Sequence, residues 1–387
     1  MDKEAIAVGG PATLPVLKLG KHTPAYPLIQ GGMGVRISAS RLAGAVARAG
    51  GVGTIASVGL GMSSRHYTGK NYFDANKLAL ADEITAARKT SPDGVLAVNC
   101  MVALTDYEDM VRTSAENGAQ VIISGAGLPM QLPEYTKGYP DVALVPIVSS
   151  VKAARLIARK WEKAHGRLPD AFVVEAPGVA GGHLGARTED VFSPELTLER
   201  VVPELVEYLS AELGADIPVV AAGGIWGRDD MMQAFALGAR GVQMGTRFVC
   251  TRECDAPEAF KMMYLKATAE DIALVKSPVG LPGRAIRNQF LNGLASGAPQ
   301  KHRCIANCLK HCSFRSDKQG FCIATALITA HSGDVQGGLV FSGSNASRCR
   351  EIVSVSDVMA DLFGQPELGA AAEKAHLALR SASSMRL

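Results

Sequence analysis

The chain has 387 residues, of which 47% are hydrophobic and 20% charged, and its formal net charge is +3 at pH 7. That length suits one α/β barrel with an extension, and the composition is that of a soluble globular enzyme. A net charge so near neutral gives no reason to expect nucleic-acid or membrane binding by the whole surface.

The ends and the hydropathy of the chain predict a cytoplasmic protein. Residues 1–17 lack the basic start and apolar core of a signal peptide. No apolar run reaches the ~18 residues that a membrane-spanning helix needs. In the reducing cytoplasm, the eight cysteines should be reduced or metal-bound rather than paired.

Short β-rich runs alternate with segments of helical periodicity, which is the pattern of a parallel sheet with crossover helices. Several runs are apolar without alternation, as expected of strands that are covered on both faces. The count of eight favours a closed (β/α)8 TIM barrel over an open doubly wound sheet. The strands are predicted at residues 26–30, 52–56, 95–99, 120–124, 142–148, 171–175, 217–222 and 241–244.

Helix signals fit between these strands. Ser38 is predicted to cap the helix after the first strand, and Asp229 and Asp230 to begin the helix after the seventh. The chain changes character after the eighth strand. We predict that residues 1–250 form the barrel and that residues 251–387 form an extension packed on it.

The predicted strand ends, where barrels carry their reactive groups, are rich in glycine. Glycine lets backbone N–H groups approach a phosphate, and the loops after strands seven and eight bind phosphate in many barrels. Any one of these glycines could simply form a turn. Gly223-Gly224 and Gly245-Thr246 together, at adjacent strand ends, predict a phosphate site. No convincing G-x-G-x-x-G dinucleotide fingerprint is present.

His183 is the strongest catalytic candidate. It lies in a glycine-rich loop at the end of the sixth strand, which we expect to be flexible. An imidazole there can orient a substrate or move a proton near neutral pH. Ser124 lacks the G-x-S-x-G context of a hydrolase nucleophile.

The motifs PLIQGGMG, VNC, AGGHLG and AAGGIWGRDDMMQAFALGARGVQMGTRF resemble the nitronate monooxygenase (2-nitropropane dioxygenase) family, whose relatives include flavin-containing enoyl-ACP reductases. This resemblance, over residues 24–295, implies a barrel with bound FMN and flavin redox chemistry. His183 matches the family's active-site histidine. By the same resemblance, the residues that would hold FMN are Gly31, Gly32, Met33, Asn99, Gly181, Gly182, Gly223, Gly224, Gly245 and Thr246.

The chain departs from the family pattern before this histidine. Family members commonly carry an acidic or amide residue seven positions before it, whereas Ala176 stands at that position here and Glu175 at eight. No flavin role is therefore assigned to Glu175. The cysteine-bearing tail resembles a subgroup of the family.

A cysteine cluster follows the predicted barrel. Its spacing is C-x3-C-x3-C-x9-C, and four thiolates so close together can ligate a [4Fe–4S] cluster or a zinc ion. We predict the iron–sulfur cluster, with zinc and reduced packing thiols as the alternatives. Cys100, Cys250, Cys254 and Cys349 are interpreted as isolated small hydrophobic residues. The predicted ligands are Cys304, Cys308, Cys312 and Cys322.

Basic residues surround the cluster, against the single acid Asp317. We interpret them as a solvated face that offsets the charge of the thiolates; the alternative is an anionic partner such as a CoA, an acyl carrier protein or RNA. These residues are Lys301, Arg303, Lys310, Arg315 and Lys318.

The leading functional hypothesis is a nitronate-monooxygenase-like enzyme, in which a small-molecule substrate reduces FMN and O2 or another acceptor reoxidises it. His183 would act as acid/base or bind the substrate oxyanion. The alternative enzyme is an NAD(P)H-dependent flavin reductase of enoyl thioesters or quinones. A third hypothesis is an FMN-holding binding protein whose basic cysteine tail engages a macromolecule. A homodimer is compatible with each.

Overall fold

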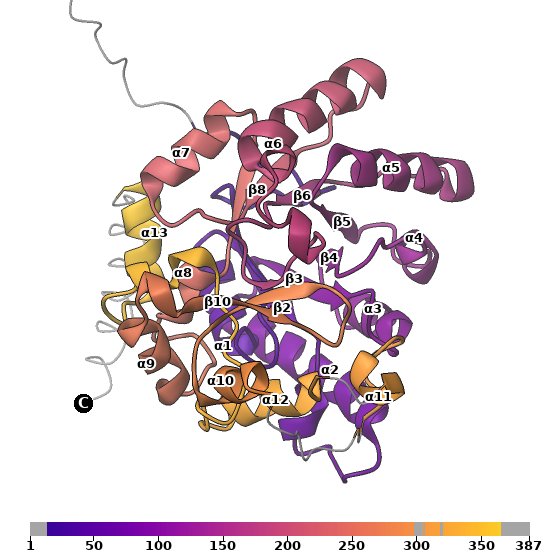
Figure 1. Ribbon diagram of the computed structural model, residues 1–387. Helices are drawn as coiled ribbons and strands as arrows, with labels where there is room; N and C mark the ends of the chain where they lie inside the picture. Colours follow the sequence, from indigo (N-terminus) through magenta and orange to yellow (C-terminus); the bar gives the residue numbers. More distant parts are fainter. Residues whose placement is uncertain (1–13, 298–303, 305, 318–319, 365–387) are drawn as a thin grey trace, which may run out of the picture.

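The computed structural model describes residues 14–297, 304, 306–317 and 320–364 (Figure 1). Parallel strands close into a barrel in the order β1-β2-β3-β4-β5-β6-β8-β9. Every boundary lies within two residues of its predicted position, so the predicted TIM barrel is confirmed. The strands are β1 (Leu28–Gln30), β2 (Val52–Ala56), β3 (Val95–Met101), β4 (Val121–Gly125), β5 (Ala143–Val148), β6 (Phe172–Glu175), β8 (Val219–Ala222) and β9 (Gly241–Met244).

The strand runs are continuously apolar because both faces of the barrel wall are buried. Ile29, Val95 and Val173 belong to one hydrophobic cluster. Their chain neighbours Leu28, Leu96 and Phe172 belong to a second one, which contains the apolar faces of the surrounding helices. Successive side chains of a strand point to opposite faces, so the first cluster fills the barrel and the second surrounds it.

Helices follow the strands around the outside of the barrel. None of the helices in the described ranges is long and apolar enough to cross a membrane. The helices that follow the barrel strands are α1 (Ser40–Arg48), α2 (Tyr72–Thr90), α3 (Tyr107–Glu116), α4 (Leu132–Tyr135), α5 (Val151–His165), α6 (Leu198–Glu207), α7 (Arg228–Ala236) and α8 (Thr246–Val249).

The first helix is not capped as the sequence predicted. The Ser38 hydroxyl accepts a hydrogen bond from the Met33 amide (2.8 Å) and makes no cap. Asp255 takes that role from more than 200 residues away, because its carboxylate accepts the amides of Ala39 (2.8 Å) and Leu42 (3.1 Å). The acidic start of α7 is as expected, since Asp230 accepts the amide of Gly227 (3.0 Å).

The C-terminal segment folds back over the barrel. Its hairpin pairs with β7 (Gly182–His183) in a three-stranded sheet of order β10-β11-β7, and Figure 1 shows β10 lying across the strands of the barrel. At the other end of the segment, α13 packs against α1, α7 and α8. We call residues 272–345 the cap. The elements of the segment are α9 (Glu258–Lys266), β10 (Ile272–Lys276), β11 (Pro282–Ile286), α10 (Gln289–Ala295), α11 (Ser313–Asp317), α12 (Ile323–His331) and α13 (Val355–Phe363).

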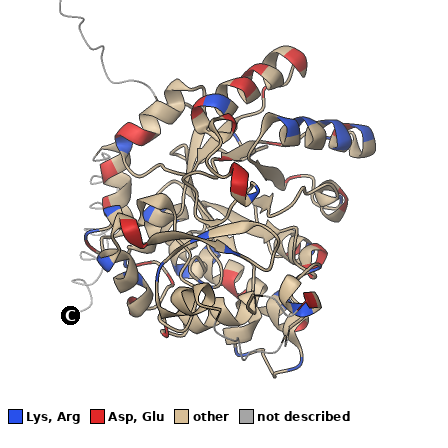
Figure 2. Cartoon of the chain, viewed as in Figure 1, with Lys and Arg blue, Asp and Glu red and all other residues tan. Residues whose placement is uncertain are grey.

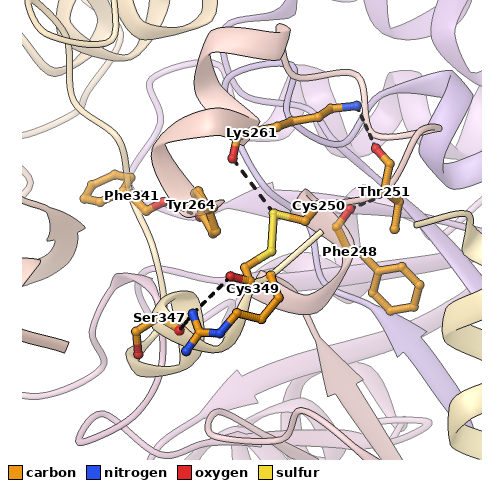
Figure 3. Close-up of a disulfide and its surroundings, with 9 residues drawn as sticks. Phe248, Cys250, Thr251, Lys261, Tyr264, Phe341, Ser347 and Cys349 are labelled. Atoms are coloured by element: carbon orange, nitrogen blue, oxygen red, sulfur yellow. Dashed lines mark hydrogen bonds between the residues drawn. A yellow bond between two sulfur atoms is a disulfide. The ribbon is translucent and has the colours of Figure 1, made fainter. Parts of the chain in front are cut away.

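Two cysteines that the sequence analysis treated as isolated form a disulfide (Figure 3). Cys250 follows α8 and Cys349 follows a 3₁₀ turn over Ser344–Arg348, and their Cα atoms lie 6.8 Å apart. The expectation that no cysteine is paired is therefore wrong for these two. They meet because the chain returns to the barrel after 99 residues, which no local pattern indicates.

Candidate active site

A cavity of about 480 Å³ opens at the C-terminal ends of the barrel strands. Its volume is within the usual range for sites that bind small molecules. His183 and all ten residues that the resemblance assigned to FMN line this one cavity. These residues from five strand ends thus converge, as expected where the active sites of such barrels lie.

One end of the cavity is closed by a segment that the sequence analysis missed. The backbone amide of Gly343 donates to the Thr246 hydroxyl (3.0 Å), and the side-chain amide of Asn345 donates through Nδ2 to the Gly224 carbonyl (2.6 Å). A Cβ atom on Gly181 would lie 2.6 Å from the Gly343 nitrogen, so the two glycine loops are in direct backbone contact. The run Ser342-Gly343-Ser344-Asn345 was the available signal, being rich in small residues that let a backbone approach a phosphate.

The opposite glycine loop, after β1, lies against Asn99 at the end of β3. A Cβ atom on Gly32 would lie 2.4 Å from the Cβ of Asn99, so only glycine permits this approach. Two buried polar atoms of the cavity wall, Oε1 of Gln243 and Oγ of Ser342, have no hydrogen-bond partner in the described part of the chain. Buried polar atoms are nearly always paired, so these two indicate a polar ligand.

His183 does not lie in a flexible loop as predicted. It forms the short strand β7, and its backbone pairs with Gly283 of β11. Its Nε2 hydrogen-bonds the Ser277 hydroxyl (2.8 Å), and its ring meets Phe341 edge to face at 5.0 Å. Burial lowers its pKa to about 4, so the imidazole is neutral at physiological pH.

Glu175 is the second titratable group of the cavity. It ends β6, and its carboxyl group lines the cavity close to the strand ends. Burial raises its pKa to about 7, and the positive charge of Arg284 opposes this rise. Near neutral pH this carboxyl group can therefore both hold and release a proton.

The remaining wall of the cavity is apolar and comes from both parts of the chain. The barrel contributes Tyr72, Met101 and Leu104. The cap contributes a second part of this surface, and most of its residues belong to a separate hydrophobic cluster or pack against it. The cap residues of the wall are Val279, Leu281, Leu309, Ile323, Leu327, Ile328 and Phe341.

The predicted metal centre is not supported. Within the described ranges, which include all four cysteines, no group of three or more His, Cys, Asp or Glu side chains could hold a metal ion. Cys308 and Cys322 are buried in apolar surroundings, whereas Cys304 is exposed. Burial, with the neighbouring thiols, raises the pKa of Cys308 to about 12, so its thiol is protonated. Two of the four thiols therefore pack among apolar side chains.

The basic residues near these cysteines are engaged internally. Lys310 donates to the carbonyl of Val102 (2.9 Å), and Arg315 donates to the carbonyls of Leu309 and Lys310 (2.9 Å each). Lys301, Arg303 and Lys318 lie outside the described residues. Figure 2 shows acidic and basic residues mixed over most of the chain, with basic residues concentrated on α5.

Comparisons with known proteins agree with this geometry. A (3aS,4S,5R,7aS)-5-hydroxy-7a-methyl-1-oxo-octahydro-1H-indene-4-carboxyl-CoA dehydrogenase of Mycobacterium tuberculosis is 30% identical over 70% of this chain and 66% of its own length. A probable nitronate monooxygenase of Staphylococcus saprophyticus is 26% identical over 69% of this chain and 77% of its own. The structure of FabK from Thermotoga maritima superposes with a TM-score of 0.67 at 26% identity, covering 91% of this chain and 96% of that one.

The chain thus spans slightly less than two thirds of the first of these relatives. The sequence profile described as nitronate monooxygenase matches residues 16–365, which is nearly the whole chain. The chain belongs to the nitronate monooxygenase family.

Proposed function

We propose that this protein is an FMN-dependent oxidoreductase whose flavin lies in the cavity at the strand ends. The observation that carries the proposal is that glycine loops line one cavity together with two buried polar atoms, Gln243 Oε1 and Ser342 Oγ, that have no hydrogen-bond partner among the described residues. The residues that fit the phosphate end are Gly181, Gly182, Gly223, Gly224, Gly245, Thr246 and Gly343, and those that fit the ring end are Gly31, Gly32, Met33 and Asn99.

Bound FMN would supply the hydride and electron chemistry, and the protein would supply position and electrostatics. In this proposal His183 binds an oxygen atom of the substrate as a neutral imidazole. The Ser277 hydroxyl fixes the orientation of its ring by bonding Nε2. Nδ1 is then the atom that can face a ligand. Its N–H group can donate a hydrogen bond to negative charge that develops on the substrate oxygen.

Glu175 is proposed to hold or release the proton that accompanies the reaction. A general acid or base works best with a pKa near the working pH, which is where burial places this group. Its carboxyl group forms no hydrogen bond to another described residue, so a ligand in the cavity can reach it.

We propose a nitronate or a related compound with an apolar body as the substrate. The apolar wall formed by the cap suits a hydrocarbon part, and His183 suits an oxygen at the reacting end. The test is anaerobic reduction of the bound flavin by the nitronate of 1-nitropropane, followed as loss of the visible flavin absorption. A flavin-containing protein that stays oxidised with nitronates of every chain length would contradict this assignment.

The relation to FabK favours a second candidate, an NAD(P)H-dependent reductase of enoyl thioesters or quinones. Under the same anaerobic conditions, NADH or NADPH would then bleach the flavin, whereas the nitronate would not. Reoxidation by O2 in the first case, or by an enoyl thioester in the second, would identify the electron acceptor.

A further inference from the structure

One arginine of the cap reaches into the loop that carries the candidate catalytic histidine. Arg284 lies on β11, is 3% exposed, and its backbone pairs with Gly182 of β7. Its guanidinium donates to the carbonyl oxygens of Pro177 (3.1 and 3.2 Å) and Gly178 (3.0 Å), and to that of Ala180. A single side chain therefore binds three carbonyl oxygens of the loop between β6 and β7.

This arginine has a buried charge that no ion pair neutralises in the described part of the chain. Its hydrogen bonds all go to backbone carbonyls, and only Glu175 acts on it as a nearby opposite charge. Buried charges are costly unless they are paired, and an apolar residue could often fill such a place at lower cost. The arrangement therefore points to a role in the site itself.

We propose that Arg284 is a positioning residue of this active site: it holds the loop that presents His183 to the flavin, and it places its guanidinium beside the start of that loop, two residues after Glu175. The proposal rests on the proposed function of the cavity. It also makes the cap part of the active site, since the side chain that bonds three carbonyls of this loop comes from β11.

The electrostatic half of the proposal has a defined direction. Arg284 on β11 is the charged group of the cap that acts on Glu175, and His183 on β7, which lines the same cavity, is neutral. Burial favours the protonated form of Glu175, and the positive charge of Arg284 favours the ionised form. Removing that charge should raise the pKa of Glu175, so the carboxyl group would lose its proton only at higher pH.

The experiment uses the FMN-loaded protein with three substitutions. Arg284→Met removes both the charge and the hydrogen bonds, whereas Arg284→Lys keeps the charge and removes the planar fork. Arg287→Met is the matched control, because Arg287 is an exposed arginine just after the same strand. The first readout is the visible flavin spectrum titrated from pH 5 to 9, in which ionisation of Glu175 should appear as a spectral change with a defined midpoint pH. Glu175→Gln is the variant that should show no such midpoint.

We expect the midpoint of Arg284→Met to move up by roughly one pH unit. Arg284→Lys should stay near the wild-type midpoint. With the reductant that bleaches the wild-type flavin, both variants should reduce it at least tenfold more slowly with a smaller change in KM, because the loop is no longer held. Arg287→Met should match wild type in both measurements.

Two results would overturn the inference. One is a midpoint and a reduction rate in Arg284→Met that both equal those of wild type. The other is an equal loss of flavin by Arg284→Lys and Arg284→Met with unchanged spectra in the remaining holoprotein, which would make Arg284 a structural residue only. If Arg284→Met does not fold, Arg284→Gln replaces it. A wild-type flavin that no donor reduces contradicts the proposed function instead, and the titration still tests the charge effect.

Discussion

The barrel and the cap are built by different kinds of contact. In the barrel, each strand pairs mainly with a strand close to it in the chain, as Val52 of β2 does with Val95 of β3. In the cap, Gly283 of β11 pairs with His183, a hundred positions away. The barrel therefore supplies the frame and the glycine loops, whereas the cap decides how the reactive side chains face the cavity.

The two regions also differ in what their apolar residues do. Those of the barrel fill its interior and the layer beneath the helices, and some of them, such as Ile37 and Met244, also line the cavity. Those of the cap, including Leu309, Ile323 and Leu327, form the wall of the cavity itself. We expect substitutions in the barrel to change stability and substitutions in the cap to change which substrate is accepted.

The strongest test of this contrast acts where the two regions meet. His183→Ala should lower turnover by roughly 10²–10⁴-fold while FMN stays bound, because the imidazole provides a hydrogen bond or proton transfer rather than a cofactor contact. Flavin content and the rate of anaerobic flavin reduction measure the two effects. Activity within a few-fold of wild type would remove His183 from the mechanism.

The second test separates cofactor binding from folding. Gly181→Ala would place a methyl group 2.6 Å from the Gly343 nitrogen, so the barrel loop and the cap loop must move apart. Overpacking of this kind costs roughly 1–3 kcal/mol, which corresponds to FMN binding that is about 5–150-fold weaker. Equilibrium titration of the apoprotein with FMN measures this. Gly138→Ala, where the added methyl group meets nothing, is the control. Equal affinity of both variants would show that the two loops do not form the phosphate end.

The third test uses the pH dependence of stability. The pKa of Glu175 is raised by burial, so the folded protein binds its proton more tightly than the unfolded chain. Its ionisation therefore destabilises the fold progressively as the pH rises from about 4.5 to about 7, and fully above that. Glu175→Gln should remove this penalty and stabilise the flavin-free protein at pH 8 by about 2–3 kcal/mol, with little gain at pH 5. Urea unfolding at both pH values measures it, and an equal gain at both would refute a buried, titrating Glu175.

The smallest effect is expected at the cysteines of the cap. Cys308→Ala removes a buried packing thiol and should cost about 1 kcal/mol, whereas Cys304→Ala, at an exposed position, should be near neutral. Neither change should alter metal content. The measurement is elemental analysis of anaerobically prepared protein. One equivalent of zinc or four of iron in the wild type, lost on either substitution, would support the metal site instead.

Much of the barrel could be predicted from local sequence because its signals are local. The run Val52–Ala56 is mostly apolar and buried throughout, and glycines after β1, β4, β8 and β9 mark the turns at these strand ends. The residues assigned to FMN by resemblance do line one cavity, although their contacts with a flavin stay a prediction. The capping of α1 failed as a prediction because Asp255, not the local Ser38, is the residue that reaches the free amides.

The sequence by itself determined that the strands are covered on both faces, how many they are, and that a histidine stands among glycines at the end of one of them. Only the tertiary structure decided that this histidine is paired with a hairpin, that Arg284 fixes its loop, and that Ser342 and Gly343 close the cavity. It also decided that Cys250 forms a disulfide with Cys349. Among the described residues, it does not arrange the four-cysteine motif as a group of side chains that could hold a metal ion. The reason is physical: burial pattern and turn chemistry are properties of neighbouring residues, whereas contacts between segments a hundred residues apart depend on where the folded barrel places their surfaces.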